Sequence, residues 1–229
     1  WSISILLFII IFILVQSYLL YFYFQMPLLK SLLINNIIQI HIWKIDETLF
    51  NLKKLVSLSR EQKKVFQTRK SLIKKKQYLA SRRLMEMFSI NDVCGVFDIS
   101  SFENKNIFYS ISHTDKFAIL SFGNVMNGVD IESYRSKIIN IKSRFINQKE
   151  NFATNTNDIK VLTRLWTSKE ATFKCMLTKG LSLKNDIEIK KFNKESKFGF
   201  ANVYLRNKVI KVNLHFINFN NYELTLAHI

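Results

Sequence analysis

The chain has 229 residues, which is enough for one ordinary domain or two small ones. Its 34 Lys and Arg against 17 Asp and Glu give a net charge of +17, and 48% of its residues are hydrophobic. That apolar content excludes a disordered basic tail, and five Gly with one Pro exclude collagen-like and linker sequences. Two cysteines, Cys94 and Cys175, form no CxxC pair, which excludes a disulfide scaffold, disfavours a zinc site and indicates a reducing compartment.

The positive charge has two interpretations that composition leaves open. The chain is rich in Lys, Asn, Ile and Phe, as a base-composition bias in a gene would make it. Alternatively, the charge serves an acidic partner, a polyphosphate ligand or nucleic acid.

Residues 1–25 contain no Asp, Glu, Lys or Arg. The run from Ile3 to Phe24 is long enough to span a bilayer, for which about 20 apolar residues suffice. It lacks the basic start and the small-residue cleavage site of a secretory signal, and it begins with Trp1. We expect an apolar extension translated from upstream sequence, with Met26 as the first plausible start. A membrane anchor and a signal segment are the alternatives.

The elements expected after Met26 alternate between strands and helices. Alternating polarity predicts strands, and apolar residues near the helical period predict helices, one of which begins at the capping-box pair Ser59 and Gln62. Strands are expected at 37–43, 107–111, 117–122, 126–131, 200–205, 209–217 and 222–227, and helices from residue 59 through about residue 85 and at 161–177. The order predicts an α+β fold with two similar halves, residues 26–125 and 126–229, divided near Asn124 to Asn127.

Two carboxylates stand out in the stretch Gly128-Val129-Asp130-Ile131-Glu132. Residues two apart on a strand share a face, so Asp130 and Glu132 point the same way while Val129 and Ile131 face the core. Adjacent carboxylates repel each other unless a cation lies between them, and this pattern favours a divalent metal. A solvated sheet edge is the alternative.

A second charged pattern follows about 40 residues later, in Trp166-Thr167-Ser168-Lys169-Glu170-Ala171-Thr172-Phe173-Lys174. Trp166, Glu170 and Lys174 are spaced four apart and share one helix face. By itself a Glu–Lys pair at this spacing is only a helix-stabilising ion pair. The same face would also add a third carboxylate and a cation to a magnesium site that takes substrate phosphate oxygens.

Together the two patterns, in this order and at this separation, resemble the signature pair of the 4'-phosphopantetheinyl transferase superfamily. Three further stretches resemble the longer, Sfp-like members: Ile111-Ser112-His113-Thr114, the basic helix Lys75 to Arg82, and Lys179-Gly180-Leu181-Ser182. The resemblance extends from about Ile37 to the C-terminus. It implies a pseudo-dimeric fold of two α+β halves with the active site between them.

The resemblance also implies an activity and its residues. Such enzymes are Mg2+-dependent and transfer the phosphopantetheine arm of coenzyme A to a serine of an acidic apo carrier protein, in fatty-acid or secondary-metabolite biosynthesis. The implied metal ligands are Asp130, Glu132 and Glu170; Glu170, Lys174 and Asp130 are the implied catalytic residues; and the groups implied to bind coenzyme A are Arg82, Ser112, His113, Lys169 and Lys174. Arg83 follows Arg82 directly, so either guanidinium is a candidate for the 3'-phosphate.

We therefore expect a cytoplasmic, monomeric transferase that binds neither nucleic acid nor, unless residues 3–24 are a genuine anchor, a membrane. The alternative is a non-catalytic basic protein on the same fold that binds carrier protein or nucleic acid. His41, His215 and His228 are expected to be structural, and Cys175 is expected to be a core thiol.

Overall fold

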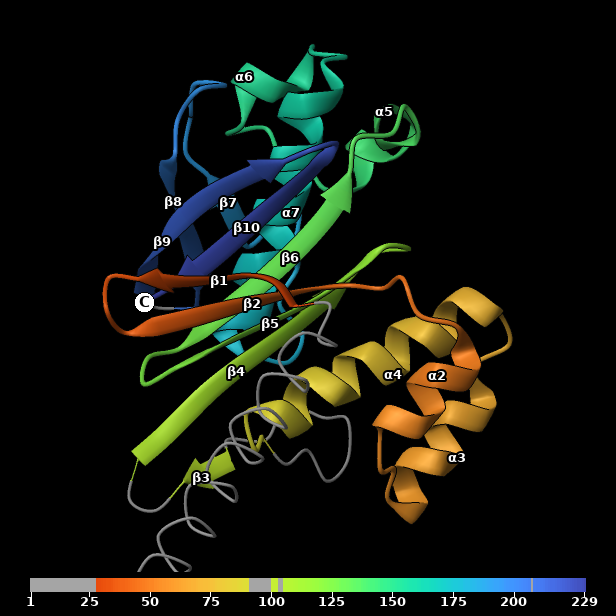
Figure 1. Cartoon of the computed structure of the whole chain (residues 1–229). Helices are drawn as coiled ribbons and strands as arrows, with labels where there is room; N and C mark the ends of the chain where they lie inside the picture. The colour runs from red at the N-terminus through yellow and green to blue at the C-terminus, as the bar shows by residue number, and fades with distance from the viewer. Residues whose placement is uncertain (1–27, 91–99, 103–104, 207) are drawn as a thin grey trace, which may run out of the picture.

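The computed structural model describes residues 28–90, 100–102, 105–206 and 208–229 (Figure 1). The apolar run 3–24 and Cys94 lie outside these residues. Within the described part of the chain, no helix combines the length and the apolar character needed to cross a bilayer.

The first half is an antiparallel sheet with helices on one side (Figure 1). Its strand order is β1-β2-β5-β4-β3. The strands are β1 (Leu28–Ile34), β2 (Ile38–Lys44), β3 (Ser100–Phe102), β4 (Lys105–His113) and β5 (Phe117–Gly123). The helices are α2 (Leu49–Leu55), α3 (Arg60–Thr68) and α4 (Leu72–Met87). Strand β1 was not among the expected elements; it pairs with β2 through a turn in which Asn35 and Asn36 have φ of 50° and 58°.

The long helix expected after Ser59 is two helices. The capping box is present, since the Ser59 and Gln62 side chains each bond the other's backbone. The chain then leaves the helical conformation at Arg69, and the Ser71 hydroxyl accepts a hydrogen bond from the Lys74 amide to begin α4. Helix α4 buries Leu79 and Leu84 against the first sheet.

The second half is another antiparallel sheet, with strand order β6-β10-β9-β8-β7. Its strands are β6 (Asn127–Ser133), β7 (Ile187–Ile189), β8 (Phe198–Leu205), β9 (Lys208–Phe219) and β10 (Tyr222–His228). Its helices are α5 (Lys137–Ile141), the 3-10 turn η1 (Lys142–Arg144), α6 (Asn151–Thr154) and α7 (Ile159–Met176). The two sheets and their helices confirm the predicted mixed α+β class.

Both sheets follow one connection rule. A strand leads to a long helix, the chain returns as a meander, and the last strand of the meander pairs with the first strand. In the first half these are β2, α4 and β5, and in the second half they are β6, α7 and β10.

Serine side chains join the two sheets where β4 meets β6. The Val129 amide donates to Ser110 Oγ at 3.0 Å, and the Ile131 amide donates to Ser112 Oγ at 3.2 Å. Beside this seam a shared apolar cluster forms from Ile38, Ile40, Ile42, Phe117, Ile119, Val129, Ile131, Tyr222, Leu224 and Leu226. Because β2 and β6 both contribute to it, the cluster fixes the position of one half on the other.

Candidate functional site

The candidate site lies where α7 crosses the face of β6. Val129 and Ile131 are buried in the shared cluster, at 0% and 1% exposure, so the alternation of the strand turns Asp130 and Glu132 toward the opposite face. The strand register places Thr225 opposite Asp130, and Thr225 Oγ1 lies 2.8 Å from Thr167 Oγ1 of α7. The carboxylate face of β6 is therefore the face that α7 covers.

Gly128 allows this close approach. A Cβ atom at this position would lie 2.1 Å from the carbonyl oxygen of Ala171 and 2.4 Å from the amide nitrogen of Cys175. Both atoms belong to the backbone of α7, so no side-chain movement would relieve the contact. The glycine that precedes the two carboxylates is thus what lets the helix lie against the strand.

Asp130 is the centre of the polar contacts. Its Oδ1 accepts from Lys174 Nζ at 2.7 Å and from Ser112 Oγ at 2.8 Å. Lys174 Nζ also donates to the Val129 carbonyl at 3.1 Å, which holds the ammonium group against the strand. The other carboxylate oxygen of Asp130, Oδ2, is buried and has no hydrogen-bond partner among the residues that the structure describes.

Two further carboxylates lie within the field of Asp130. Desolvation, followed by the negative charge of Asp130, raises the pKa of Glu132 to about 7, while Arg135, Trp166 and Lys174 act in the opposite direction. The same two causes raise the pKa of Glu170, and the charge of Lys174 again opposes them. Three acidic groups thus lie close enough to affect one another, and the charges of Lys174 and Arg135 compensate their repulsion only in part.

This donor set fits a divalent cation. Oxygen-rich sites of a few carboxylates suit Mg2+, and the buried, unpartnered Oδ2 of Asp130 is an acceptor that a cation would satisfy. In the described part of the chain, however, no three His, Cys, Asp or Glu side chains are already gathered as metal ligands. Lys174 occupies the other oxygen of Asp130 instead.

Ser112 and His113 reach the site from the end of β4. Ser112 is buried and bonds Asp130 directly. Desolvation lowers the pKa of His113, and the charges of Lys174 and Arg69 lower it further, whereas Asp130 raises it. Both predicted residues therefore lie with the Asp130 group. The proximity of Arg69 was not predicted, because nothing in its own segment distinguishes it from the surrounding lysines.

Arg82 lies on α4, in the first half. Its guanidinium carbon is 5.1 Å from the centre of the Tyr78 ring, whereas Arg83 forms an ion pair with Glu86 at 3.5 Å. The same helix is tied to the turn after His113, because Gln77 Nε2 donates to the Thr114 carbonyl at 2.8 Å.

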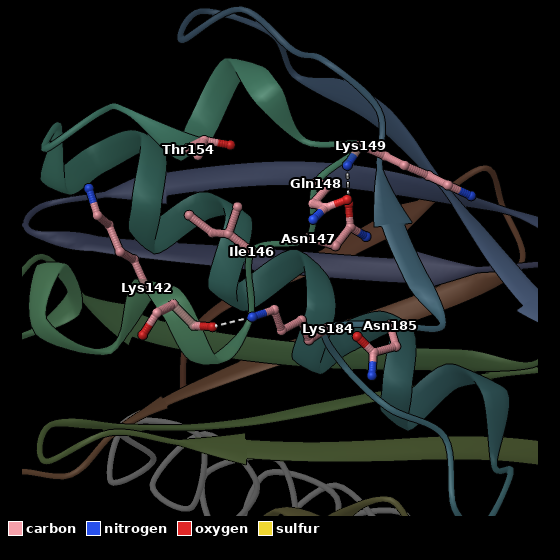
Figure 2. Close-up of a pocket in the computed structure, with 9 residues that line it drawn as sticks. Lys142, Ile146, Asn147, Gln148, Lys149, Thr154, Lys184 and Asn185 are labelled. Atoms are coloured by element: carbon pink, nitrogen blue, oxygen red, sulfur yellow. Dashed lines mark hydrogen bonds between the residues drawn. The ribbon is translucent and has the colours of Figure 1, made fainter.

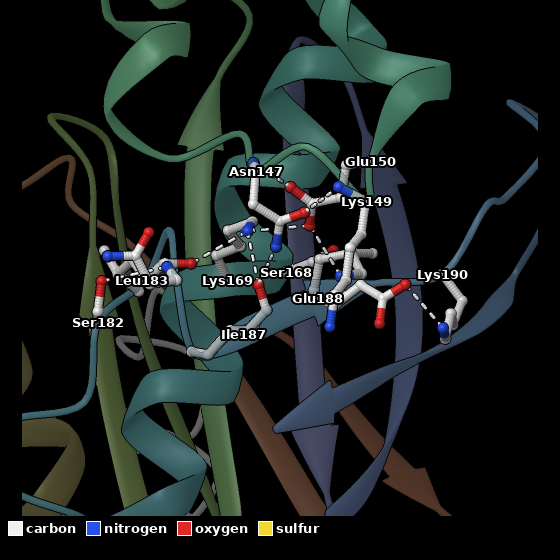
Figure 3. A network of polar contacts seen from close by, with 12 residues as sticks. Asn147, Lys149, Glu150, Ser168, Lys169, Ser182, Leu183, Ile187, Glu188 and Lys190 are labelled. Atoms are coloured by element: carbon white, nitrogen blue, oxygen red, sulfur yellow. Dashed lines mark hydrogen bonds and ion pairs between the residues drawn. The ribbon is translucent and has the colours of Figure 1, made fainter. Parts of the chain in front are cut away.

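Lys169 has a different environment from Glu170, its neighbour in sequence (Figure 3). Its side chain is fully buried, and Nζ contacts Glu150 Oε1 at 2.9 Å and the carbonyls of Leu183 and Ile187 at 3.0 and 2.7 Å. An ammonium group has three N–H donors, and these three acceptors engage all of them. The arrangement argues against the predicted contact between Lys169 and coenzyme A.

Glu150 is the partner that sequence reasoning missed. Its Oε1 also accepts from the Ile189 amide at 2.8 Å, and its Oε2 accepts from the Asn147 amide at 2.9 Å. Burial raises the pKa of Glu150 and lowers that of Lys169, and the opposite charge of each partner counteracts the shift of the other. The pair attaches α7 to the loop before α6 and to β7. Glu150 lies in a loop 19 residues from Lys169, with no local pattern to signal the contact.

The residues expected to be structural are buried. Cys175 is a free thiol with 0% exposure in the core of the second half, and burial raises its pKa to about 12. His41 stacks on Phe88 at 3.8 Å between ring centres, and His215 contacts His228 with 3.1 Å between their Nε2 atoms.

Comparison with known protein families supports the assignment made from the two motifs. Residues 126–227 match the 4'-phosphopantetheinyl transferase superfamily, so the second half of the chain is a domain of that superfamily. The match begins just before β6 and ends within β10, and it therefore includes all three predicted metal ligands and Lys174. No curated protein gives a significant match to the chain.

Proposed function

We propose that this member domain of the 4'-phosphopantetheinyl transferase superfamily transfers the phosphopantetheine arm of coenzyme A to a serine of an apo carrier protein. The observation that carries the proposal is the contact between the two motifs. Lys174 of the second motif bonds Asp130 of the first at 2.7 Å, beside a carboxylate oxygen that has no hydrogen-bond partner within the described part of the chain. Glu132 and Glu170 lie within the field of the same aspartate.

Asp130, Glu132 and Glu170 would hold Mg2+ in this proposal. When bound, the metal would neutralise negative charge on the pyrophosphate of coenzyme A. Lys174, which now bonds Asp130 and the Val129 carbonyl, would also contact the phosphate oxygens, because its ammonium is a compact charge on a flexible stem.

The reaction exchanges one phosphorus–oxygen bond for another. The serine oxygen bonds the phosphorus that carries pantetheine, and the bond from that phosphorus to the bridging oxygen breaks. Adenosine 3',5'-bisphosphate leaves with the electron pair, and Glu170, directly or through a water, accepts the serine proton. Catalysis then depends mainly on positioning and charge stabilisation.

Ser112, His113 and Arg82 would bind coenzyme A. Ser112 would keep Asp130 oriented through its 2.8 Å hydrogen bond, and His113 would contact phosphate oxygens from the end of β4. Arg82 is the proposed ligand of the 3'-phosphate, since a guanidinium can bond phosphate in a bidentate manner. The positive charge of Arg69 and Lys174 around His113 favours a polyanion at this place.

The repeated order of strand, helix and returning meander supports a pseudo-dimeric arrangement, in which residues 26–125 and 126–229 are similar halves. Such a chain would need no second copy to form the site, and we propose that it acts as a monomer in the cytoplasm. The net charge of +17 would attract an acidic carrier protein by electrostatic steering.

The test is the intact mass of an apo acyl carrier protein after incubation with the full chain, coenzyme A and Mg2+. We expect a gain of one phosphopantetheine arm that EDTA prevents. Asp130→Asn and Glu170→Gln should lower the rate by at least about 100-fold. Glu195→Gln is the matched control, because it removes one charge from an exposed residue and should leave the rate unchanged.

Absence of any mass gain with several acyl and peptidyl carrier proteins would contradict the proposal. It would favour the alternative of a non-catalytic binder on the same fold. In that case Asp130→Asn should leave binding of the carrier protein or of nucleic acid intact.

A further inference from the structure

A cavity of about 520 Å³ opens in the second half, on the side of α7 that faces η1 and α6 (Figure 2). Its walls are η1, the loop before α6, the end of α6 and the turn before β7. The lining residues are Lys142, Ser143, Ile146, Asn147, Gln148, Lys149, Thr154, Lys184 and Asn185. The volume lies in the range of small-molecule sites.

The lining of this lysine pocket is cationic and rich in donors. None of the nine lining residues is acidic, and three of them are lysines. Within the described residues, Lys142, Lys149 and Lys184 form no ion pair with a carboxylate. Lys149 Nζ lies over the Tyr204 ring, 3.8 Å from its centre, so contacts to a ligand depend on Lys142 and Lys184.

Hydrogen bonds hold two of these ammonium groups at the cavity without using all of their donors. Lys142 Nζ donates to the Thr156 carbonyl and to Asn157 Oδ1, both at 3.1 Å. Lys184 Nζ donates to the Ser143 carbonyl at 2.8 Å. Since each ammonium has three N–H groups, one donor on Lys142 and two on Lys184 form no hydrogen bond with the described residues and are left for a ligand.

The floor of the pocket is rigid because Asn147 is bonded on three sides. Its Oδ1 accepts from the Lys149 amide at 2.8 Å, its Nδ2 donates to the Ile187 carbonyl at 3.2 Å, and its own amide donates to Glu150. Asn147, which lines the pocket in Figure 2, thus also bonds Glu150 of the buried pair of Glu150 and Lys169, which Figure 3 shows. The cavity is therefore part of the packed structure of the second half.

We propose that the lysine pocket binds a small polyanion of the pyrophosphate class, at a site distinct from the Asp130 group. Lysines on separate walls suit a ligand with two or more anionic centres better than one with a single centre. None of the nine lining residues is aromatic, so the pocket offers no ring on which an aromatic base could stack. The inference is independent of the proposed transfer reaction.

The experiment is calorimetric titration of the full chain with inorganic pyrophosphate in EDTA-containing buffer, with sulfate as the single-centre comparison. We expect pyrophosphate to bind at least about tenfold more tightly than sulfate. Lys142→Gln combined with Lys184→Gln should weaken pyrophosphate binding by about tenfold or more. Lys63→Gln combined with Lys64→Gln removes the same charge from exposed positions on α3 and should change it by less than about twofold.

Two further variants make the outcome decisive. Gln148→Glu places a negative charge in the pocket without removing a lysine, and it should also weaken binding, even if the double lysine variant fails to fold. In Lys174→Ala, which removes the cation at the Asp130 group, pyrophosphate should still bind, and the double lysine substitution should still weaken that binding. Equal losses from the two lysine pairs, loss of binding with Lys174→Ala alone, or no binding of pyrophosphate to the native chain would each overturn the proposal.

Discussion

Replacing Glu150 by glutamine tests whether Lys169 holds α7 in place or is available to a ligand. The substitution preserves the shape of the side chain and removes its charge. Lys169, with 0% exposure, would then be a buried ammonium group bonded only to uncharged acceptors. The glutamine NH2 would also face one of the present donors, the Asn147 amide or the Lys169 ammonium.

The expected cost follows from the burial of both partners. Removing one member of a buried ion pair costs about 3–5 kcal/mol, because the remaining charge is uncompensated. A domain of this kind has a total stability of about 5–15 kcal/mol, so the variant should unfold at clearly lower denaturant concentration. Glu195→Gln, an exposed control, should change the free energy of unfolding by less than about 0.5 kcal/mol.

The assay is urea unfolding followed by circular dichroism, on the two single variants and their combination. Lys169→Met removes the ammonium and keeps most of the aliphatic side chain. It should also destabilise the protein, although Glu150 would keep its bonds from the Ile189 and Asn147 amides. Because the two residues act as a pair, we expect the double variant to cost about 2 kcal/mol less than the sum of the single variants.

The opposite result would refute the reasoning. If each single variant changed the unfolding free energy by less than about 1 kcal/mol and the effects were additive, Glu150 and Lys169 would not be a buried pair. A Lys169→Met variant of normal stability with a raised KM for coenzyme A would instead place Lys169 at the ligand. With the structure as described, any loss of activity should accompany the loss of stability.

Three other predictions follow from the same elements. Gly128→Ala should destabilise the protein by at least about 2 kcal/mol in urea unfolding and abolish transfer, since its Cβ would lie 2.1 Å from the Ala171 carbonyl oxygen. Gly180 has φ of +79° but open space around it, so Gly180→Ala should cost only about 1 kcal/mol. Similar losses of stability at the two glycines would contradict the role given to the Gly128 contact. Arg164→Met should lower the free energy of unfolding by about 3–5 kcal/mol, because Glu223 would lose its cation. The two side chains are 2.6 Å apart, and Glu223 is 1% exposed. A change below about 1 kcal/mol would show that stability does not require the pair. Burial lowers the pKa values of His41 and His215 from 6.5 to about 4, so the unfolded chain binds more protons below pH 6.5. The contribution of these histidines to stability should therefore be constant above pH 6.5 and fall by about 1–3 kcal/mol per histidine between pH 6.5 and 4. Unfolding free energies that did not fall over this range would contradict the burial of the two neutral histidines.

Local sequence determined the elements that carry the candidate site. The alternation around Asp130 and the helical spacing of Trp166, Glu170 and Lys174 predicted β6 and α7 nearly as they occur. These features depend on contacts within a few residues, namely strand alternation and neighbours on one helix turn. The capping box at Ser59 is local in the same sense and was also predicted correctly.

Competition between local signals was harder to predict. The helical period continues from α3 into α4, yet the chain breaks between them because Ser71 caps a new helix. Strand β1 has the sequence LLKSLLI, whose apolar residues occur as one pair and one run of three and do not alternate regularly. It becomes a strand because β2 offers it an edge for pairing.

Only the tertiary structure distinguished Lys169 from Lys174, two lysines of one motif. On the helix they point in different directions, and what each meets depends on packing: Lys174 meets Asp130, and Lys169 meets a glutamate from a distant loop. The need for glycine at Gly128 likewise depends on how closely α7 approaches β6. The hydrophobic period and the helix caps depend on neighbours along the chain, so the sequence determined the elements that carry the site. Burial and ion pairing depend on which segments meet in space, so the packing decided the environment of each side chain.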